Sequence, residues 1–237
     1  MLHRRLKKEF HFSSKEIGTF AIIAILSGLI LSFRMWGDGK TIDVNAGIEN
    51  MIIMSIMAFI AIFVHFCGEK FYAIWKGMET KYHANFPALG IGLFLAVLTN
   101  GFAFILAPGY LMPKVKMKSR VGKWRYRPYV REYGYMANFG ILANIILAAI
   151  FGAFIANPIV YKFVIANILI AAFSLIPAPR YDGMHLFFGS FYNFAFSVGF
   201  TIAFAVTLFY AGVGYAILTG VVLGFVGFFT VFKNNWE

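Results

Sequence analysis

The sequence predicts an all-α polytopic membrane protein with about six transmembrane helices and one re-entrant hairpin. Of its 237 residues, 60% are hydrophobic and 13% are charged, whereas soluble domains typically carry about 25% charged residues. The mean hydropathy is +0.75, and several apolar runs are long enough to cross a bilayer. These values exclude soluble, fibrous, disordered and secreted disulfide-rich proteins. The formal net charge is +11. The side of the membrane on which the Lys and Arg residues lie indicates the topology.

The N-terminal region, residues 1–16, is a basic tail with no signal-peptide cleavage site, so we expect it to be retained in the cytosol. Ser13 and Glu16 have capping-box spacing, which is typical of a helix start. A single membrane domain is expected over residues 17–232, followed by a cytosolic C-terminus at 233–237. Its helices are expected at residues 17–33, 51–76, 136–157, 159–177, 191–210 and 213–232.

The segment 86–112 is apolar enough to span the membrane, but it contains a turn signal. Asn100 and Gly101 separate two apolar arms, and an Asn-Gly pair in that position favours a β-hairpin. We therefore expect a re-entrant β-hairpin that packs against the bundle, since strand edges are not tolerated in lipid. A seventh spanning helix is the alternative.

The basic residues favour the re-entrant path. If both flanks of 86–112 lie on one side, that side holds 18 of the 21 Lys and Arg, and only Arg34, Lys40 and Lys162 lie opposite. The positive-inside rule then places both termini and the basic loop 113–135 in the cytosol. We expect a multi-pass protein of a prokaryotic plasma membrane rather than of an organelle.

Ionisable residues inside apolar runs are candidates for function, because they are costly to bury in a membrane. His65 and Glu69 are four residues apart, so they project from one face of the second predicted helix. Asp182 enters from the same side and could complete a divalent cation site with them. Alternatively, His65 and Glu69 form a hydrogen-bonded pair without metal, and Asp182 pairs with Arg180 or caps a helix.

Two motifs resemble those of the site-2 protease family of intramembrane zinc metalloproteases. Residues 175–183, Leu-Ile-Pro-Ala-Pro-Arg-Tyr-Asp-Gly, are similar to the family's aspartate motif, and His185 follows them. Residues 140–144 are similar to its Gly-Pro-Leu-Ala-Asn motif, with Ile141 at the proline position. The order of motifs and helices resembles that of the compact archaeal and bacterial members over nearly the whole chain. The resemblance implies a site-2-protease-like helical core, a zinc site and transmembrane segments as substrates.

The chain departs from this family at the motif that carries the chemistry. In the family, two histidines of His-Glu-x-x-His and the later aspartate bind zinc, and the glutamate is the general base. Here His65 stands at the first histidine, Phe66 at the glutamate and Glu69 at the second histidine, while Asp182 stands at the aspartate. Phe66 cannot accept a proton. One histidine with two carboxylates also suits a harder ion better than zinc.

Two residues match positions of the family motifs associated with substrate. Asn144 ends the second motif, and Ser174 stands where the family usually has a substrate-positioning asparagine. An asparagine in a membrane helix can instead serve as an interhelical hydrogen-bonding group. Cys67 is the only cysteine, which excludes an internal disulfide, and we expect it to be a packing residue.

The loop 113–135 carries 8 Lys and Arg interleaved with aromatic residues. Such a loop is attracted to anionic lipid headgroups by about 1 kcal/mol per charge. It could also bind an acidic protein or ribosomal RNA near a translocon, with Arg125 and Arg127 among the contacts.

The residues thus favour a proteolytically inactive homologue that binds transmembrane segments or a membrane partner. The second interpretation is an active zinc metalloprotease with a rearranged site, in which Glu69 serves as ligand or base. The third is a scaffold or insertion factor that associates with the translocon or ribosome through the basic loop.

Overall fold

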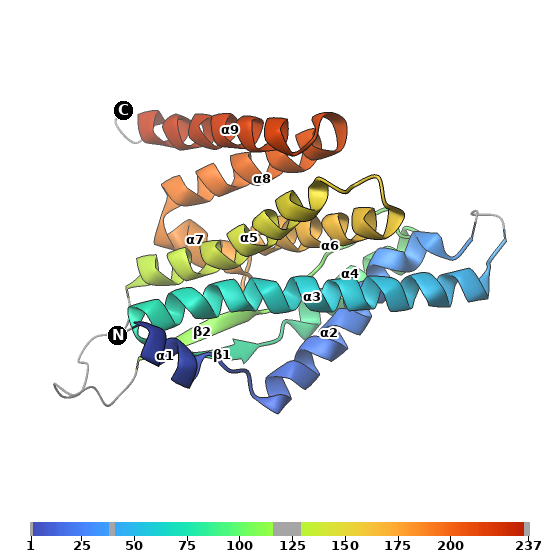
Figure 1. Cartoon of the computed structure of the whole chain (residues 1–237), viewed down its shortest axis with the longest axis horizontal. Coiled ribbons are helices and arrows are strands. Elements are labelled where there is room, and N and C mark those ends of the chain that lie inside the picture. Colours follow the sequence, from blue (N-terminus) through green and yellow to red (C-terminus); the bar gives the residue numbers. More distant parts are fainter. Residues whose placement is uncertain (1, 38–40, 116–128, 235–237) are drawn as a thin grey trace.

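The computed structural model describes residues 2–37, 41–115 and 129–234. Its longest element, the 33-residue helix α3, runs through the middle of the molecule with α2 and α5 packed along it (Figure 1). The elements in chain order are α1 (Leu2–Glu9), α2 (Ser14–Ser32), η1 (Phe33–Met35), α3 (Val44–Lys76), β1 (Met78–His83), α4 (Phe86–Leu98), β2 (Tyr110–Val115), α5 (Val130–Gly152), α6 (Pro158–Ser174), α7 (Asp182–Gly189), α8 (Phe191–Ala211) and α9 (Val213–Asn234).

The described residues include 5 helices long and apolar enough to cross a membrane, namely α2 with η1, α3, α5, α8 and α9. The prediction of a mainly helical integral membrane protein is therefore confirmed. The sixth expected span corresponds to α6, which has 17 residues. Helix α1 and the end of α9 lie at the same end of the long axis (Figure 1).

Local signals explain where the long helices begin and end. The Ser13 hydroxyl accepts a hydrogen bond from the Glu16 amide and the Glu16 carboxylate accepts one from Ser13, so the predicted capping box is confirmed. Asp43 caps α3 in the same manner. Gly77 ends α3 in the left-handed region, with φ of 78°, where glycine has no side-chain penalty.

Several boundaries differ from those expected. Helix α3 begins at Val44 rather than at 51, because Asp43 provides a cap well before the apolar run. Helix α5 begins at Val130 rather than at 136. The first residues of the expected loop 113–135 therefore belong to β2, and its last residues belong to α5. The tail 1–16 contains α1, and α7 was not expected.

The expected β-hairpin over 86–112 is wrong. Its first arm is the helix α4, which begins with Pro87 in its first turn, where the fixed φ of proline favours a helix. The turn itself lies where it was expected, with positive φ at Asn100 and Gly101, and residues 102–109 then return without regular secondary structure. A helix satisfies its own backbone groups, which an isolated hairpin cannot do in an apolar environment.

A small sheet that the sequence did not reveal closes this excursion. Strand β1 pairs antiparallel with β2, with Met78 opposite Val115 and His83 opposite Tyr110. The pairing brings both ends of residues 84–109 together, so the chain enters and leaves at one end of the bundle. Just before residues 84–109, the chain is joined to α2, because the Tyr82 amide of β1 donates a hydrogen bond to the Glu16 carboxylate at 3.1 Å. The turn after α4 reaches the other end of α2, where the Arg34 guanidinium lies 3.9 Å from the Phe102 ring centre.

We predict that Gly92→Ala destabilises the protein, because a Cβ at this position would lie 1.9 Å from the Ile105 carbonyl oxygen. The expected loss is about 1–3 kcal/mol, as for other overpacked sites. Gly90→Ala in the same helix is the matched control, since nothing lies within 4 Å of its added Cβ. Thermal unfolding in detergent measures both variants, and equal unfolding temperatures for them would contradict this packing.

Candidate functional site

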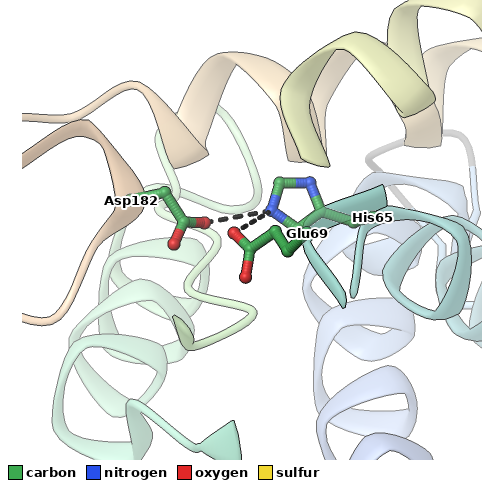
Figure 2. A group of neighbouring side chains, drawn as sticks. All are labelled: His65, Glu69 and Asp182. Carbon is green, nitrogen blue, oxygen red and sulfur yellow. Dashed lines mark hydrogen bonds and ion pairs between the residues drawn. The ribbon is translucent and has the colours of Figure 1, made fainter. Parts of the chain in front are cut away.

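The predicted ligands His65, Glu69 and Asp182 meet in the interior of the protein. His65 and Glu69 lie one turn apart on α3, and Asp182 is the first residue of α7 (Figure 2). Their exposed fractions are 0%, 0% and 1%. The structure thus brings together residues that are more than a hundred positions apart in the chain.

The imidazole of His65 is the centre of the group. Its Nε2 lies 3.0 Å from Oδ2 of Asp182 and 3.5 Å from Oε1 of Glu69 (Figure 2). One possible ligand atom from each residue lies within 4.8 Å of the others. His65 Nδ1 has no hydrogen-bond partner among the described residues. The ring is oriented by the interaction of Nε2 with Asp182 and by packing, including a perpendicular contact with Phe66.

Glycines allow the neighbouring elements to approach these side chains. A Cβ at Gly140 of α5 would lie 2.8 Å from His65 Nε2 and 2.8 Å from Glu69 Cγ. A Cβ at Gly68 would lie 2.5 Å from the Phe139 carbonyl oxygen. Helices α3 and α5 therefore pack closely only because both positions lack side chains, which explains the glycine in the motif at 140–144.

Close packing also explains the glycine of the Asp-Gly pair at the start of α7. A Cβ at Gly183 would lie 2.2 Å from the carbonyl oxygen of Leu175. Arg180, two residues before Asp182, has a positive φ of 68°, and this turn directs the chain from α6 into α7. The linker thereby folds back on the end of α6 and presents Asp182 to His65.

The sheet supplies contacts that sequence reasoning missed. The Leu111 amide of β2 donates to Glu69 Oε2 at 3.3 Å. Burial, and then the carboxylates of Asp182 and Glu69, raise the pKa of Tyr82 in β1, so its hydroxyl stays protonated and donates to the Pro108 carbonyl. The only signal for these contacts was the alternation of buried Met78 and Tyr82 with polar residues.

Phe66, at the position of the family's general base, is a core residue. It is 0% exposed. Its ring stacks on Phe20 of α2 at 5.2 Å and meets Tyr82 at 4.8 Å between centroids. This aromatic cluster, defined as Phe20, Phe66 and Tyr82, joins α2 and β1 to α3 beside the three ionisable side chains.

The chemistry of the donor set fits a divalent cation. A neutral imidazole and two carboxylates carry a charge of about −2, which a divalent ion would neutralise, and buried net charge is strongly unfavourable. In the part of the chain that the structure describes, no group donates a hydrogen bond to Oε1 of Glu69. Without metal, neutrality would require a protonated His65 and one protonated carboxyl group.

The other predicted residues have different surroundings. Asn144 and Ser174 are 0% exposed, and both amide atoms of Asn144 and the hydroxyl of Ser174 lack partners among the described residues. His185 lies outside the ligand group, beside the rings of Tyr110 and Tyr133, and burial lowers its pKa. Arg125 and Arg127 lie outside the described residues.

Comparisons of this chain with models of protein families, with curated proteins and with solved structures find no match.

We predict that Asn144→Leu stabilises the fold by about 1–3 kcal/mol, because it removes a buried polar group without partners. Asn167→Leu is the control, since Asn167 is equally buried but donates to the Phe163 carbonyl at 2.9 Å. We expect a smaller gain or a loss from this control. Unfolding in detergent measures both, and destabilisation by Asn144→Leu would contradict the prediction.

Proposed function

We propose that this chain is a site-2-protease-like membrane protein that holds a divalent cation at His65, Glu69 and Asp182 and binds transmembrane segments without hydrolysing them. The observation that carries the proposal is the composition of the buried site. Its two carboxylates are both needed as ligands, and the residue beside His65 is the core phenylalanine Phe66.

A hydrolytic role is disfavoured because the only carboxylates of the group within the described residues are the two proposed ligands, and Phe66 stands next to His65. A bound cation would supply Lewis acidity and could bind water, but a protein group must still accept the proton. General-base catalysis typically contributes about 10²–10⁴ in rate. If Glu69 left the metal to act as base, only one carboxylate and His65 would hold the ion. We therefore place the active protease second.

The donor set also bears on which ion is bound. Oxygen ligands outnumber nitrogen in this group, and carboxylates favour harder ions such as Mn²⁺ over zinc. The site offers three donors, as many as catalytic zinc sites have. We propose that the ion has a structural role here, neutralising charge where α3, α5 and α7 meet.

The proposed contacts to a bound membrane segment are the unpartnered groups of Asn144 and Ser174. A segment that unwinds locally exposes backbone donors and acceptors, which are costly to leave unpaired in an apolar interior. The amide of Asn144 can both donate to and accept from such a backbone. These two side chains have no partners among the described residues and are 0% exposed, so the proposal requires the surrounding helices to separate when a segment binds.

Elemental analysis of purified protein tests the metal centre. We expect about one divalent ion per chain, which three buried ligands can hold. Glu69→Gln should reduce the metal content, because it removes a charge and an anionic ligand. Glu49→Gln is the matched control, as Glu49 lies on the same helix but is exposed. Equal metal content in both variants, or metal-free wild type after growth with Mn²⁺ and Zn²⁺, would contradict the site.

Incubation with a fluorescent peptide containing one transmembrane helix tests the absence of hydrolysis. We expect the peptide to stay intact and to co-elute with the protein from a size-exclusion column. Asn144→Leu should weaken this association, and the Asn167→Leu variant should retain it. The proposal fails if the peptide is cleaved, the cleavage stops with a chelator, and Asp182→Ala abolishes it.

A further inference from the structure

A groove of about 500 Å³ lies beside the sheet, and none of His65, Glu69 and Asp182 lines it. It lies between the first turns of α2, the end of β1 and the start of α4. Its polar lining includes Lys15, Lys81 and His83, and its apolar lining includes Phe86. The groove is therefore amphipathic, with basic groups beside an exposed aromatic ring.

The basic groups of this groove are not neutralised by the protein. Lys15 and Lys81 are exposed, and neither forms an ion pair or a hydrogen bond through its ammonium group within the described chain. Burial, and then the charges of Lys81 and Lys114, lower the pKa of His83. His83 is therefore held in its neutral form, and the positive charge of the groove comes from Lys15 and Lys81.

One carboxylate, that of Glu16, also lines the groove, but its oxygens are already occupied. Oε2 accepts from the Ser13 amide at 2.9 Å and from the Ser13 hydroxyl at 3.1 Å, and Oε1 accepts from the Tyr82 amide at 3.1 Å. These bonds hold Glu16 in its capping position. Glu16 keeps its negative charge but forms no ion pair with Lys15 or Lys81 among the described residues, so two positive charges face one negative charge in the groove.

The groove lies at the beginning of two apolar helix surfaces. Ile17 of α2 is 42% exposed and Phe86 of α4 is 47% exposed, and further along α4 Ile91 and Phe94 are exposed as well. Since α2 is long and apolar enough to cross a membrane, its first turn is where headgroups end and acyl chains begin. A ligand with an anionic head and apolar chains matches this order of surfaces.

We propose that this groove binds one anionic phospholipid, with the phosphate between Lys15 and Lys81 and the acyl chains along α2 and α4. The site differs from a general attraction of basic residues to the membrane, because residues of three elements line one groove and the apolar side chain of Phe86 lies in the same lining as the two lysines. None of the proposed metal ligands lines the groove, so lipid binding there does not require the proposed function.

Native mass spectrometry of delipidated full-length protein tests the site. Dioleoyl-phosphatidylglycerol should bind about tenfold more tightly than dioleoyl-phosphatidylcholine. The double variant Lys15→Gln/Lys81→Gln should bind phosphatidylglycerol about thirtyfold more weakly, as expected for the loss of two charges near a headgroup. The control Lys7→Gln/Lys8→Gln removes two exposed lysines of α1 at the same end of the molecule. It should bind phosphatidylglycerol as the wild type does.

Three results would overturn the proposal. An equal loss in both double variants would show a diffuse charge effect. Equal binding of the two lipids by the wild type would show no headgroup selection. Displacement of phosphatidylglycerol by millimolar inorganic phosphate would show a phosphate site without a role for the acyl chains. Thermal unfolding of the variants, expected to match the wild type, confirms that a loss of binding is not a loss of folding.

Discussion

The burial of one imidazole and two carboxylates at a single point constrains the rest of this structure. His65, Glu69 and Asp182 are almost completely inaccessible to solvent, and such groups are stable inside a bundle only when their charges are compensated and their orientations are held. The compensation must come from a cation or from protons shared within the group. Their orientation comes from four separate elements, since α3 carries two of them, α7 the third, α5 the glycine that makes room and β2 an amide donor.

The same requirement explains the unusual excursion of residues 84–109. Strand β2 can donate to Glu69 only if the chain returns to the end of the bundle from which α4 departed, and pairing with β1 ensures this return. Helix α4 satisfies its own backbone on the way in. The irregular return packs against it at Gly92, where only a glycine leaves space for the Ile105 carbonyl, so a protein surface covers backbone that lipid could not accommodate.

The aromatic cluster and the unpartnered amide indicate different uses of the interior. Phe66 contributes to stability, because its ring packs between Phe20 and Tyr82 where a charged base would need a partner. Asn144 reduces stability, because its amide is buried without hydrogen bonds among the described residues. An aliphatic side chain at this position would avoid the loss of stability. The presence of an asparagine there is consistent with selection for binding. Phe66 and Asn144 thus agree with the proposed role in binding rather than in hydrolysis.

The class of fold, the long apolar helices, the capping box at α2 and the shared face of His65 and Glu69 could be predicted from the sequence, because each depends on residues within a few positions of one another. Asp182 was expected to join them because it enters the membrane region from the same side, and residues 175–183 also resemble a family motif. The helix α4, the pairing of β1 with β2 and the positions of Leu111 and Tyr82 beside the site became visible only in the three-dimensional structure. These features depend on contacts between segments that are distant in the sequence, such as Glu69 with Leu111 and Phe66 with Phe20. A local hydrophobic pattern does not specify which distant segment will hydrogen-bond to a backbone group or pack against a ring.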